Sequence, residues 1–328
     1  MGAGEVAAFR GVSKSYGRVR AVDGLDLVLR PGETVALLGP NGAGKSSSLD
    51  LLLGLREPDR GSVTLFGGAP RAAITAGRVG AMLQSGGLMA DVKVRELVRL
   101  ACDVHPRGRA VAEVLADAGI TDLAERRVDR LSGGQEQRVR FALAVAGAND
   151  LIVLDEPTTG MDVSVRQAFW ASMRAQADAG RTVLFATHYL EEADSIADRV
   201  LVLHRGRLIA DGSSAEIKAR AGVRRIAFEL HEADGAFDDA ALRLLPGVQG
   251  LETTARVPGV RTVRIRAADA DAAVAALYRA GLYPRGLEVT GLGLEQAFLT
   301  ITGEQDAASS TESAESASSA ETALESAR

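Results

Sequence analysis

A glycine-rich run around Lys45 is the stretch of sequence whose residue types best suit ligand chemistry. Glycines let a backbone curl so that successive N–H groups point at phosphate oxygens, and a helix that follows adds the partial positive charge of its N-terminus. The Lys45 ammonium would contact the β- and γ-phosphates, and the Ser46 hydroxyl is placed to ligate Mg²⁺. This pattern predicts a nucleotide site and leaves kinases, GTPases and transporters open. The run comprises Gly39, Pro40, Asn41, Gly42, Ala43, Gly44, Lys45, Ser46 and Ser47.

A second anion site is indicated by the run Leu131-Ser132-Gly133-Gly134-Gln135. Serine is a favoured N-cap residue, and a serine-capped helix offers free backbone N–H groups at its start. One nucleotide would already occupy the glycine-rich loop around Lys45, so a second anion site in the same chain requires a separate explanation. The run resembles the signature motif of ATP-binding cassette (ABC) proteins, which other P-loop families lack. In that family the signature of one subunit faces the phosphate loop of another.

The resemblance extends to two adjacent carboxylates that follow the apolar run Leu151–Leu154. By itself such a pair would usually form a solvated turn. Downstream of both motifs, it resembles the Walker B element and catalytic glutamate of ABC ATPases, at a strand end where open α/β sheets bind ligands. The resemblance implies that Asp155 holds Mg²⁺ and that Glu156 activates the attacking water as a general base.

Four further positions match the family in order, and each has a simpler structural alternative. Tyr16 matches the aromatic residue that stacks on adenine, although a lone tyrosine before a glycine usually packs in a strand. Gln84 matches the Q-loop glutamine that touches Mg²⁺ and faces the membrane partner, although an isolated glutamine is usually a surface amide. Asp162 matches the D-loop aspartate at a dimer seam, although an aspartate at this point can equally be a helix N-cap. His188 matches the switch histidine that contacts the γ-phosphate, although a lone histidine is usually structural.

The elements that must position these residues have the pattern of a parallel sheet covered by helices. Between residues 92 and 118 the periodicity is helical, with Val94, Leu97 and Val98 on one face and Arg95 and Arg99 on the other. Continuous apolar runs indicate strands buried on both faces. These runs are Thr34–Leu38, Val79–Leu83, Leu151–Leu154, Thr182–Ala186 and Val200–Leu203.

We therefore expect an α/β fold of the P-loop NTPase (ABC ATPase) type, with a sheet core and a helical insertion. The ATP-binding domain would span residues 1–215, with a helical subdomain at about 85–145. Residues 216–302 predict a small α+β domain, in which the order strand, helix, strand, strand, helix, strand is ferredoxin-like. Residues 303–328 are almost wholly Ala, Ser, Glu and Thr and predict a disordered tail.

Composition narrows the function and the location. The net charge of −5 disfavours nucleic acid as a partner, because phosphate-backbone binding draws on an excess of basic residues. Cys102 is the only cysteine, so neither an intrachain disulfide nor a cysteine metal cluster can form. The sequence holds no run approaching the roughly 20 apolar residues that a membrane helix needs. We expect a protein at the cytoplasmic face of the cell membrane, attached through partner subunits.

The resemblance implies an ATP-hydrolysing, nucleotide-binding subunit that uses ATP and Mg²⁺. Its expected partners are ABC transmembrane permease subunits and a second ATPase subunit, taken to be another copy of this chain. Residues 293–303 resemble the end of ATPase subunits from drug-resistance exporters, although an amphipathic helix burying Leu294, Ala297 and Phe298 explains them equally well. We expect export of drug-like or lipophilic compounds. An importer ATPase and a soluble ABC ATPase that acts on ribosomes or DNA stay open as alternatives.

Overall fold

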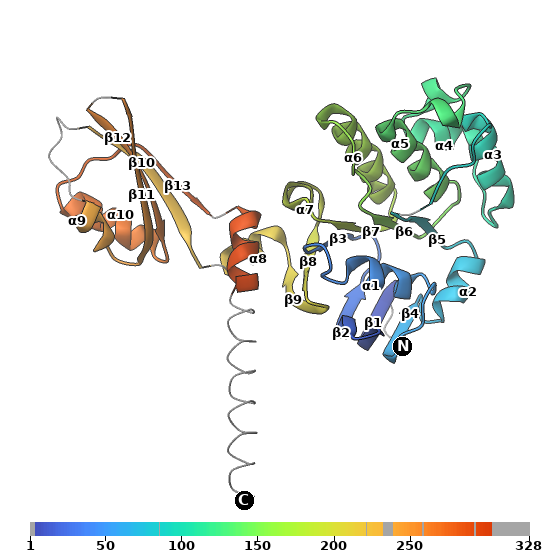
Figure 1. Ribbon diagram of the computed structural model, residues 1–328, viewed down its shortest axis with the longest axis horizontal. Coiled ribbons are helices and arrows are strands. Elements are labelled where there is room, and N and C mark those ends of the chain that lie inside the picture. The colour runs from blue at the N-terminus through green and yellow to red at the C-terminus, as the bar shows by residue number, and fades with distance from the viewer. Residues whose placement is uncertain are drawn as a thin grey trace, which may run out of the picture. The chain divides into compact units, whose positions relative to one another are not determined.

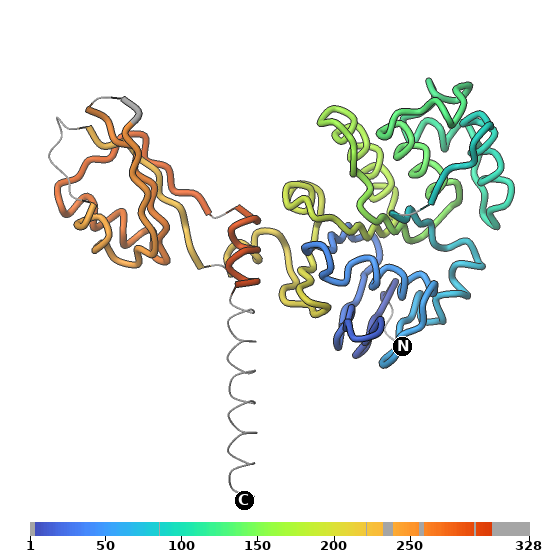
Figure 2. The backbone as a smooth tube through the Cα atoms, viewed as in Figure 1, coloured from blue at the N-terminus to red at the C-terminus, as the bar shows by residue number. Residues whose placement is uncertain are grey.

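The computed structural model describes residues 4–84, 86–220, 222–231, 239–257, 259–291 and 293–303. The chain divides into two compact units, Met1–Ser214 and Ala215–Arg328 (Figures 1 and 2). Each unit has its own apolar core, and the two are treated separately below. The tail expected to be disordered lies, from residue 304 onward, outside the described residues.

A six-stranded sheet forms the centre of the first unit, in the order β5-β6-β7-β3-β8-β9. Neighbouring strands pair in parallel except β8 and β9, which pair antiparallel. Every residue of β3, β6 and β7 is buried, which is why these strands read as continuous apolar runs. The predicted parallel sheet is confirmed. Its strands are β3 (Thr34–Leu38), β5 (Val79–Met82), β6 (Leu151–Asp155), β7 (Thr182–Thr187), β8 (Arg199–His204) and β9 (Arg207–Gly212).

A second, antiparallel sheet of three strands packs in the same unit. Its order is β2-β1-β4, and its strands are β1 (Ala7–Tyr16), β2 (Val19–Leu29) and β4 (Arg60–Leu65). Side chains of both sheets share one core with Leu49 and Leu52 of α1 (Lys45–Leu52). The short helix α2 (Pro70–Thr75) connects β4 to β5. Helix α1 is therefore held by apolar contacts to both sheets.

The expected helical insertion follows β5 and consists of α3 (Val94–Val104), α4 (Val111–Asp117) and α5 (Gly133–Ala144), which lie together in Figure 1. Two short 3₁₀ turns, Thr121–Leu123 and Val128–Arg130, precede α5. Helix α3 buries Val94, Leu97 and Val98, the face that the periodicity predicts. Helices α6 (Val163–Asp178) and α7 (Leu190–Ile196) flank β7 in sequence.

Aromatic rings connect the inserted helices to the main sheet. Phe141 of α5 contacts Phe169 of α6 with ring centroids 5.0 Å apart. Phe169 lies 5.2 Å from Trp170, which lies 4.8 Å from Phe185 of β7. The first two pairs are edge-to-face and the third is tilted, and aromatic contacts of this kind add to the stabilisation from buried area. The helical insertion is thus attached to the sheet through a continuous row of buried rings.

The second unit is an antiparallel sheet in the order β11-β12-β10-β13. The order of elements along the chain is the predicted strand, helix, strand, strand, helix, strand. Ile226, Phe228, Val263 and Ile265 form its core together with residues of α10. Residues 294–303 are helical and bury Leu294 and Ala297. Helix α8 (Ser214–Arg220) is an element that the sequence did not predict. The elements are β10 (Arg224–His231), α9 (Asp239–Arg243), β11 (Val248–Val257), β12 (Val260–Ala267), α10 (Ala270–Arg279) and β13 (Arg285–Gly291).

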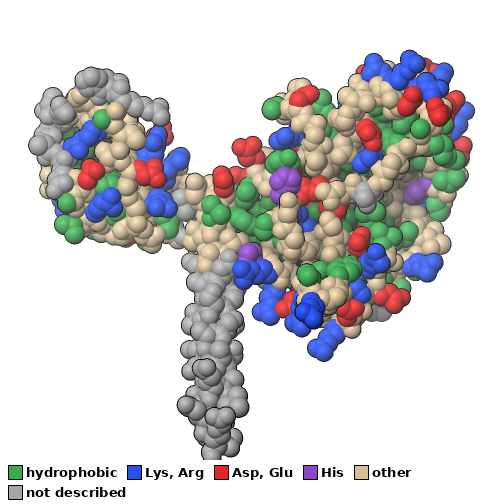
Figure 3. All heavy atoms as spheres, in the orientation of Figure 1, with side chains coloured by type: hydrophobic (Ala, Val, Ile, Leu, Met, Phe, Trp, Pro, Cys, Tyr) green, Lys and Arg blue, Asp and Glu red, His purple; other side chains and the backbone are tan. Residues whose placement is uncertain are grey.

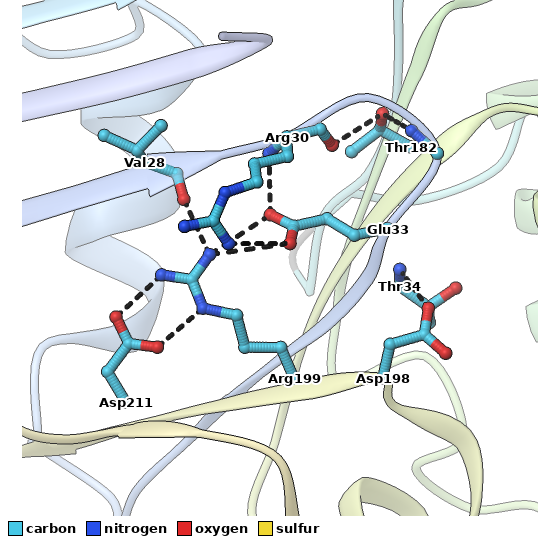
Figure 4. A network of polar contacts seen from close by, with 9 residues as sticks. Val28, Arg30, Glu33, Thr34, Thr182, Asp198, Arg199 and Asp211 are labelled. Carbon is cyan, nitrogen blue, oxygen red and sulfur yellow. Dashed lines mark hydrogen bonds and ion pairs between the residues drawn. The ribbon is translucent and has the colours of Figure 1, made fainter. Parts of the chain in front are cut away.

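A polar network fastens the amino-terminal edge of the parallel sheet (Figure 4). Arg199, the first residue of β8, donates two hydrogen bonds of 2.6 and 2.7 Å to the two carboxylate oxygens of Asp211. Its Nη1 donates to the Val28 carbonyl oxygen at 2.9 Å and to Glu33 at 3.3 Å. The hydrogen bond to Asp211 raises the pKa of Arg199. One guanidinium therefore joins β2 of the antiparallel sheet to β8 and β9 of the parallel sheet.

Replacing Arg199 by lysine keeps the charge but removes the planar fork. A single ammonium cannot pair with both oxygens of Asp211 and also reach Val28 and Glu33. We expect Arg199→Lys to lower the free energy of unfolding of the first unit by about 1–2 kcal/mol. Trp170, the only tryptophan of the sequence, lies in α6 of this unit, so its fluorescence during urea titration measures the loss.

The matched control is Arg10→Lys. Arg10 pairs with Glu5 at 3.1 Å, but its side chain is 62% exposed. Exposed pairs contribute little, so this variant should lose less than about 0.5 kcal/mol. Equal losses for Arg10→Lys and Arg199→Lys would contradict the special role of the Arg199 guanidinium, whose side chain is only 14% exposed.

Candidate functional site

A cavity of about 420 Å³ lies where β3 ends and α1 begins. Gly44 is the N-cap of α1, so the predicted glycine-rich loop leads from a buried strand into a helix. Most of the predicted loop faces this cavity, together with the exposed Gln84 that follows β5. The lining residues are Val19, Ala21, Pro40, Asn41, Gly42, Gly44, Lys45, Ser46, Ser47, Gln84 and Glu156.

Two glycines of the loop lie against backbone from other strands. Gly44 has φ 103°, and a Cβ there would lie 2.2 Å from the carbonyl oxygen of Ala21 in β2. A Cβ at Gly39 would lie 2.5 Å from the carbonyl oxygen of Leu203 in β8. Both distances are shorter than atoms can approach, so only glycine fits. The loop is therefore seated between the two sheets.

Lys45 is held beneath the loop with its ammonium almost out of contact with solvent. Its side chain is 6% exposed and lies 3.5 Å from Glu156 Oε1. Its Nζ donates to the carbonyl oxygen of Gly39 at 2.6 Å and to that of Pro40 at 3.3 Å. A buried ammonium requires such oxygen partners, since an unpaired charge away from water is costly. Lys45 thus lies at the wall of the cavity with its position fixed.

Glu156 brings together residues that are far apart in the sequence. It is buried, and its Oε2 lies 2.7 Å from Nδ1 of His188, while Oε1 faces Lys45. Its backbone is in the left-handed region at φ 49°, and its N–H donates to the Ala186 carbonyl oxygen at 3.0 Å. Strained backbone of this kind persists only where the surroundings determine it. The segments that follow β3, β6 and β7 therefore bring together one lysine, one carboxylate and one imidazole.

Asp155 is the last residue of β6, next to Glu156 in the chain. Its side chain is buried, and burial raises the pKa of its carboxyl group, against a hydrogen bond from Ser46 that lowers it. Within the described part of the chain, Asp155 Oδ1 has no hydrogen-bond partner. Mg²⁺ typically takes one or two protein ligands and completes its shell with phosphate oxygens and water. The donor set of Asp155 and Ser46 fits such an ion.

The signature residues lie apart from this cavity. Ser132 caps α5, and its Oγ accepts a hydrogen bond from the Gln135 backbone at 3.4 Å, while Gln135 Oε1 accepts from the Ser132 N–H at 3.0 Å. None of Ser132, Gly133, Gly134 and Gln135 is among the residues that line the cavity. The structural alternative, a capped helix, is therefore present. The chain by itself does not bring this segment to the phosphate loop.

Tyr16 and Asp162 are also placed outside the lining. Tyr16 pairs with Val19 across the hairpin of β1 and β2 and is 41% exposed. Asp162 is the N-cap of α6 and accepts from the Val165 N–H at 2.9 Å, which lowers the pKa of the carboxyl group. Stacking of Tyr16 on adenine and a role of Asp162 at a dimer seam stay predictions.

The structure also places residues at the site that the sequence did not indicate. Val19 and Ala21 line the cavity from β2, which no local motif reveals. Three buried polar side chains lie near Glu156 and His188 in the sequence: Thr158 after β6, Thr187 at the end of β7, and Glu192 in α7. Glu192 lies four residues after His188, and this short separation is the one sequence signal that could have drawn attention to it.

Comparison with known proteins shows the family of the chain. The family model described as ABC transporter matches residues 22–159. Over 316 residues the chain is 35% identical to the daunorubicin/doxorubicin resistance ATP-binding protein DrrA of Streptomyces peucetius, which covers 93% of this chain and 94% of that protein. The chain belongs to the ATP-binding subunits of ABC transporters. Like the other members of this family, this ABC subunit is an ATPase that works with transmembrane permease subunits.

Other ABC proteins are similar over about two thirds of the chain. The Nod factor export ATP-binding protein I of Burkholderia orbicola (strain AU 1054) is 39% identical over 212 residues, 62% of this chain and 70% of that protein. A solved ATP-binding subunit of an ABC transporter superposes with a TM-score of 0.60 at 26% identity, covering 66% of this chain and 93% of that one. A bacterial Atm1-family ABC exporter with ATP bound gives 0.59 at 27% identity, covering 67% of this chain and 40% of that one. The ABC ATPase fold is confirmed.

In the described residues of this ABC subunit, no helix combines the length and the apolar character required to cross a bilayer.

The raised pKa of Asp155 has a consequence for stability. A folded chain that raises a carboxyl pKa holds the proton more tightly than the unfolded chain, so this contribution is present at low pH and lost as pH rises through the folded pKa. At pH 7 the ionised carboxylate therefore costs stability. We expect Asp155→Asn to raise the Tm at pH 7 without Mg²⁺ by roughly 2–4 °C, a difference that vanishes near about pH 4.

Asp150→Asn is the control with the opposite sign. Burial acts to raise the Asp150 pKa, but hydrogen bonds from Arg78 and Arg107 bring the net shift below the ordinary value. That stability is present above the unfolded pKa and lost as pH falls, so Asp150→Asn should lower the Tm at pH 7. A lower Tm for Asp155→Asn at pH 7 would contradict the inferred cost of its charge.

Proposed function

We propose that two copies of this subunit close around Mg²⁺-bound ATP, and that hydrolysis powers export of drug-like or lipophilic compounds through separate membrane subunits. The observation that carries the proposal is the position of Glu156 at the cavity wall, 3.5 Å from Lys45 and 2.7 Å from His188. A carboxylate, a buried lysine and an imidazole beside a phosphate loop are the groups that positioning and activation of water at a γ-phosphate require.

Each residue of the site has a role in this proposal. Backbone N–H groups of residues 39–47 would surround the phosphates, with Lys45 on the β- and γ-phosphates. Asp155, Ser46 and Gln84 would hold Mg²⁺, which neutralises charge that develops on the phosphate oxygens. Glu156 would take the proton of the attacking water, and His188 would contact the γ-phosphate. Tyr16 would stack on the adenine.

A second copy explains the location of the signature. Ser132 and the N–H groups of Gly133 and Gly134 form a helix start that is suited to an anion, yet they lie outside the cavity of their own chain. In a head-to-tail pair, each copy would bring this segment to the γ-phosphate held by the other, with Asp162 at the seam. Hydrolysis would remove the shared ligand and release the pair.

Export is supported by the names of the relatives. The likeness to a daunorubicin/doxorubicin resistance ATP-binding protein covers 93% of this chain, so it includes the second unit as well as the cassette. The Nod factor export protein supports the same direction of transport. We place the subunit at the cytoplasmic face of the membrane. Residues 1–215 would form the ATP-binding domain, whose helical part at about 85–145 contacts the permease, and residues 216–302 a separate domain.

The assignment of Glu156 is tested with Glu156→Gln. The amide has the same shape but cannot accept the proton of water, so we expect turnover of ATP to fall by about two to four orders of magnitude. The affinity for ATP should be retained, since Lys45 and the loop are unchanged. Phosphate release measures the turnover, and calorimetric titration measures the affinity for ATP. In cells that make the chain with its membrane partner, the variant should also lose efflux of a lipophilic dye. Near-normal phosphate release would refute the assignment.

The dimer is tested by adding Gly133→Asp to the Glu156→Gln chain. A Cβ at Gly133 meets no atom within 4 Å, and an acidic side chain suits a helix N-terminus, so the fold should tolerate the change. The new carboxylate would repel the partner's γ-phosphate. Light scattering with ATP and Mg²⁺ should give a dimer for Glu156→Gln and a monomer for the double variant.

The affinity of the monomer for ATP serves as the control for Gly133→Asp, because the signature does not line the cavity of its own chain. We expect this affinity to stay within about twofold, less than half a kcal/mol. A double variant that still dimerises with ATP would contradict the head-to-tail arrangement.

A further inference from the structure

A buried carboxylate lies behind the two loops that carry the proposed catalytic residues. Glu192, in α7, is 4% exposed. Its Oε1 accepts a hydrogen bond from the Thr158 hydroxyl at 2.5 Å, and its Oε2 accepts one from the Thr187 hydroxyl at 2.9 Å. Both threonines are buried as well. Each carboxylate oxygen therefore holds one hydroxyl, and the three side chains form one connected group.

The two threonines belong to different loops. Thr158 lies two residues after Glu156, in the segment that follows β6. Thr187 is the last residue of β7 and directly precedes His188. The Thr187 hydroxyl also accepts from the Tyr189 N–H at 3.0 Å, which fixes its direction. Glu192 thus joins the segment after β6 to the end of β7 through the two threonines. The same two segments also meet through the contact between Glu156 and His188.

The charge of Glu192 is balanced by Arg166 of α6. Nε of Arg166 lies 3.7 Å from Glu192 Oε1. The Arg166 guanidinium lies 5.0 Å from the centre of the Tyr189 ring, and its Nη2 donates to the Met161 carbonyl oxygen at 3.5 Å. A buried carboxylate persists only with such partners. The group therefore reaches from the loop after β7 to the residue that precedes Asp162.

We propose that Glu192 is a positioning residue for ATP hydrolysis, which holds the loops of Glu156 and His188 at the separation needed for attack on the γ-phosphate. The proposal rests on the catalytic roles proposed for those two residues. Glu192 does not line the cavity, so it would act only through the threonines. Glu156 is held in left-handed backbone, and the hydroxyl of Thr158 is the anchor next to this strained turn.

A positioning role differs from a merely structural one in its kinetic signature. Loss of the Glu192 hydrogen bonds would displace the Glu156 carboxylate, which takes the proton of the attacking water, and the His188 imidazole, but would leave the phosphate loop and Lys45 in place. Catalysis depends steeply on such geometry, whereas ground-state binding through the loop does not. If Glu192 were only structural, its removal would lower the Tm of the chain, and kcat and the KM for ATP would change without a fixed relation to each other.

The test measures ATPase kinetics and the Tm of the full-length chain. For Glu192→Ala we expect kcat to fall by about 10- to 100-fold, with the KM for ATP within about twofold of the wild type. Glu192→Gln keeps the shape and one carbonyl acceptor, so it should recover part of the lost kcat. Glu191→Ala is the control, because Glu191 is the exposed neighbour on the same helix and should leave kcat unchanged.

The threonines supply an independent arm. Thr158→Val and Thr187→Val remove one hydroxyl each and keep the side-chain shape. Combined with Glu192→Ala, they should lower kcat no further than Glu192→Ala alone, because members of one network are not additive.

An unchanged kcat for Glu192→Ala, or full additivity with the valine variants, would overturn the positioning role. A rise in the KM for ATP that accounts for the whole loss would also overturn it. Glu156→Gln in the same assay separates this failure from failure of the proposed function. If Glu156→Gln is inactive and Glu192→Ala is normal, only the positioning role is wrong; if Glu156→Gln is itself active, the catalytic assignment is wrong.

Discussion

A buried ammonium that must be surrounded by oxygen atoms is the constraint on which the arrangement of the site depends. Lys45 satisfies it with the carbonyl oxygens of Gly39 and Pro40 and with the carboxylate of Glu156. To supply these partners the loop must curl back on itself, and β6, one strand removed from β3 in the sheet, must be followed by a carboxylate that reaches Lys45. His188 then meets Glu156 because β7 lies between β6 and β3 in the sheet. The parallel order of these three strands therefore fixes the chemistry at their ends.

The parts of the fold that the sequence predicts are those with a local cause. Fully buried parallel strands must be apolar at each position, so β3, β6 and β7 were predicted within one residue of their ends. The two carboxylates and the histidine were found because motif order places them at such strand ends. The domain fold of the second unit followed in the same way, from alternation of strand and helix patterns.

The parts that could not be predicted depend on contacts between distant segments. Val19 and Ala21 reach the cavity only because the antiparallel sheet packs beside the phosphate loop. Arg199 and Glu192 are ordinary charged residues in the sequence, and Val28 of β2 and Thr158 in the turn after β6 are partners that lie far from them in the chain. The signature is the opposite case, since family likeness implies a role for it while the single chain shows only a capped helix. Local sequence patterns thus indicate which residues could bind the nucleotide, whereas only the packed structure shows which other residues hold them in place.

The seating of the phosphate loop has a consequence for which sequences can replace it. Gly42 has φ 81° with open space around it, so the constraint at this position is conformational, and asparagine, which tolerates left-handed backbone, can replace it. Gly39 and Gly44 face carbonyl oxygens of neighbouring strands, and there no side chain of any conformation can be accommodated. Within this one motif, homologous loops should therefore tolerate substitution at the position of Gly42. They should retain glycine at the positions of Gly39 and Gly44, which touch the sheets.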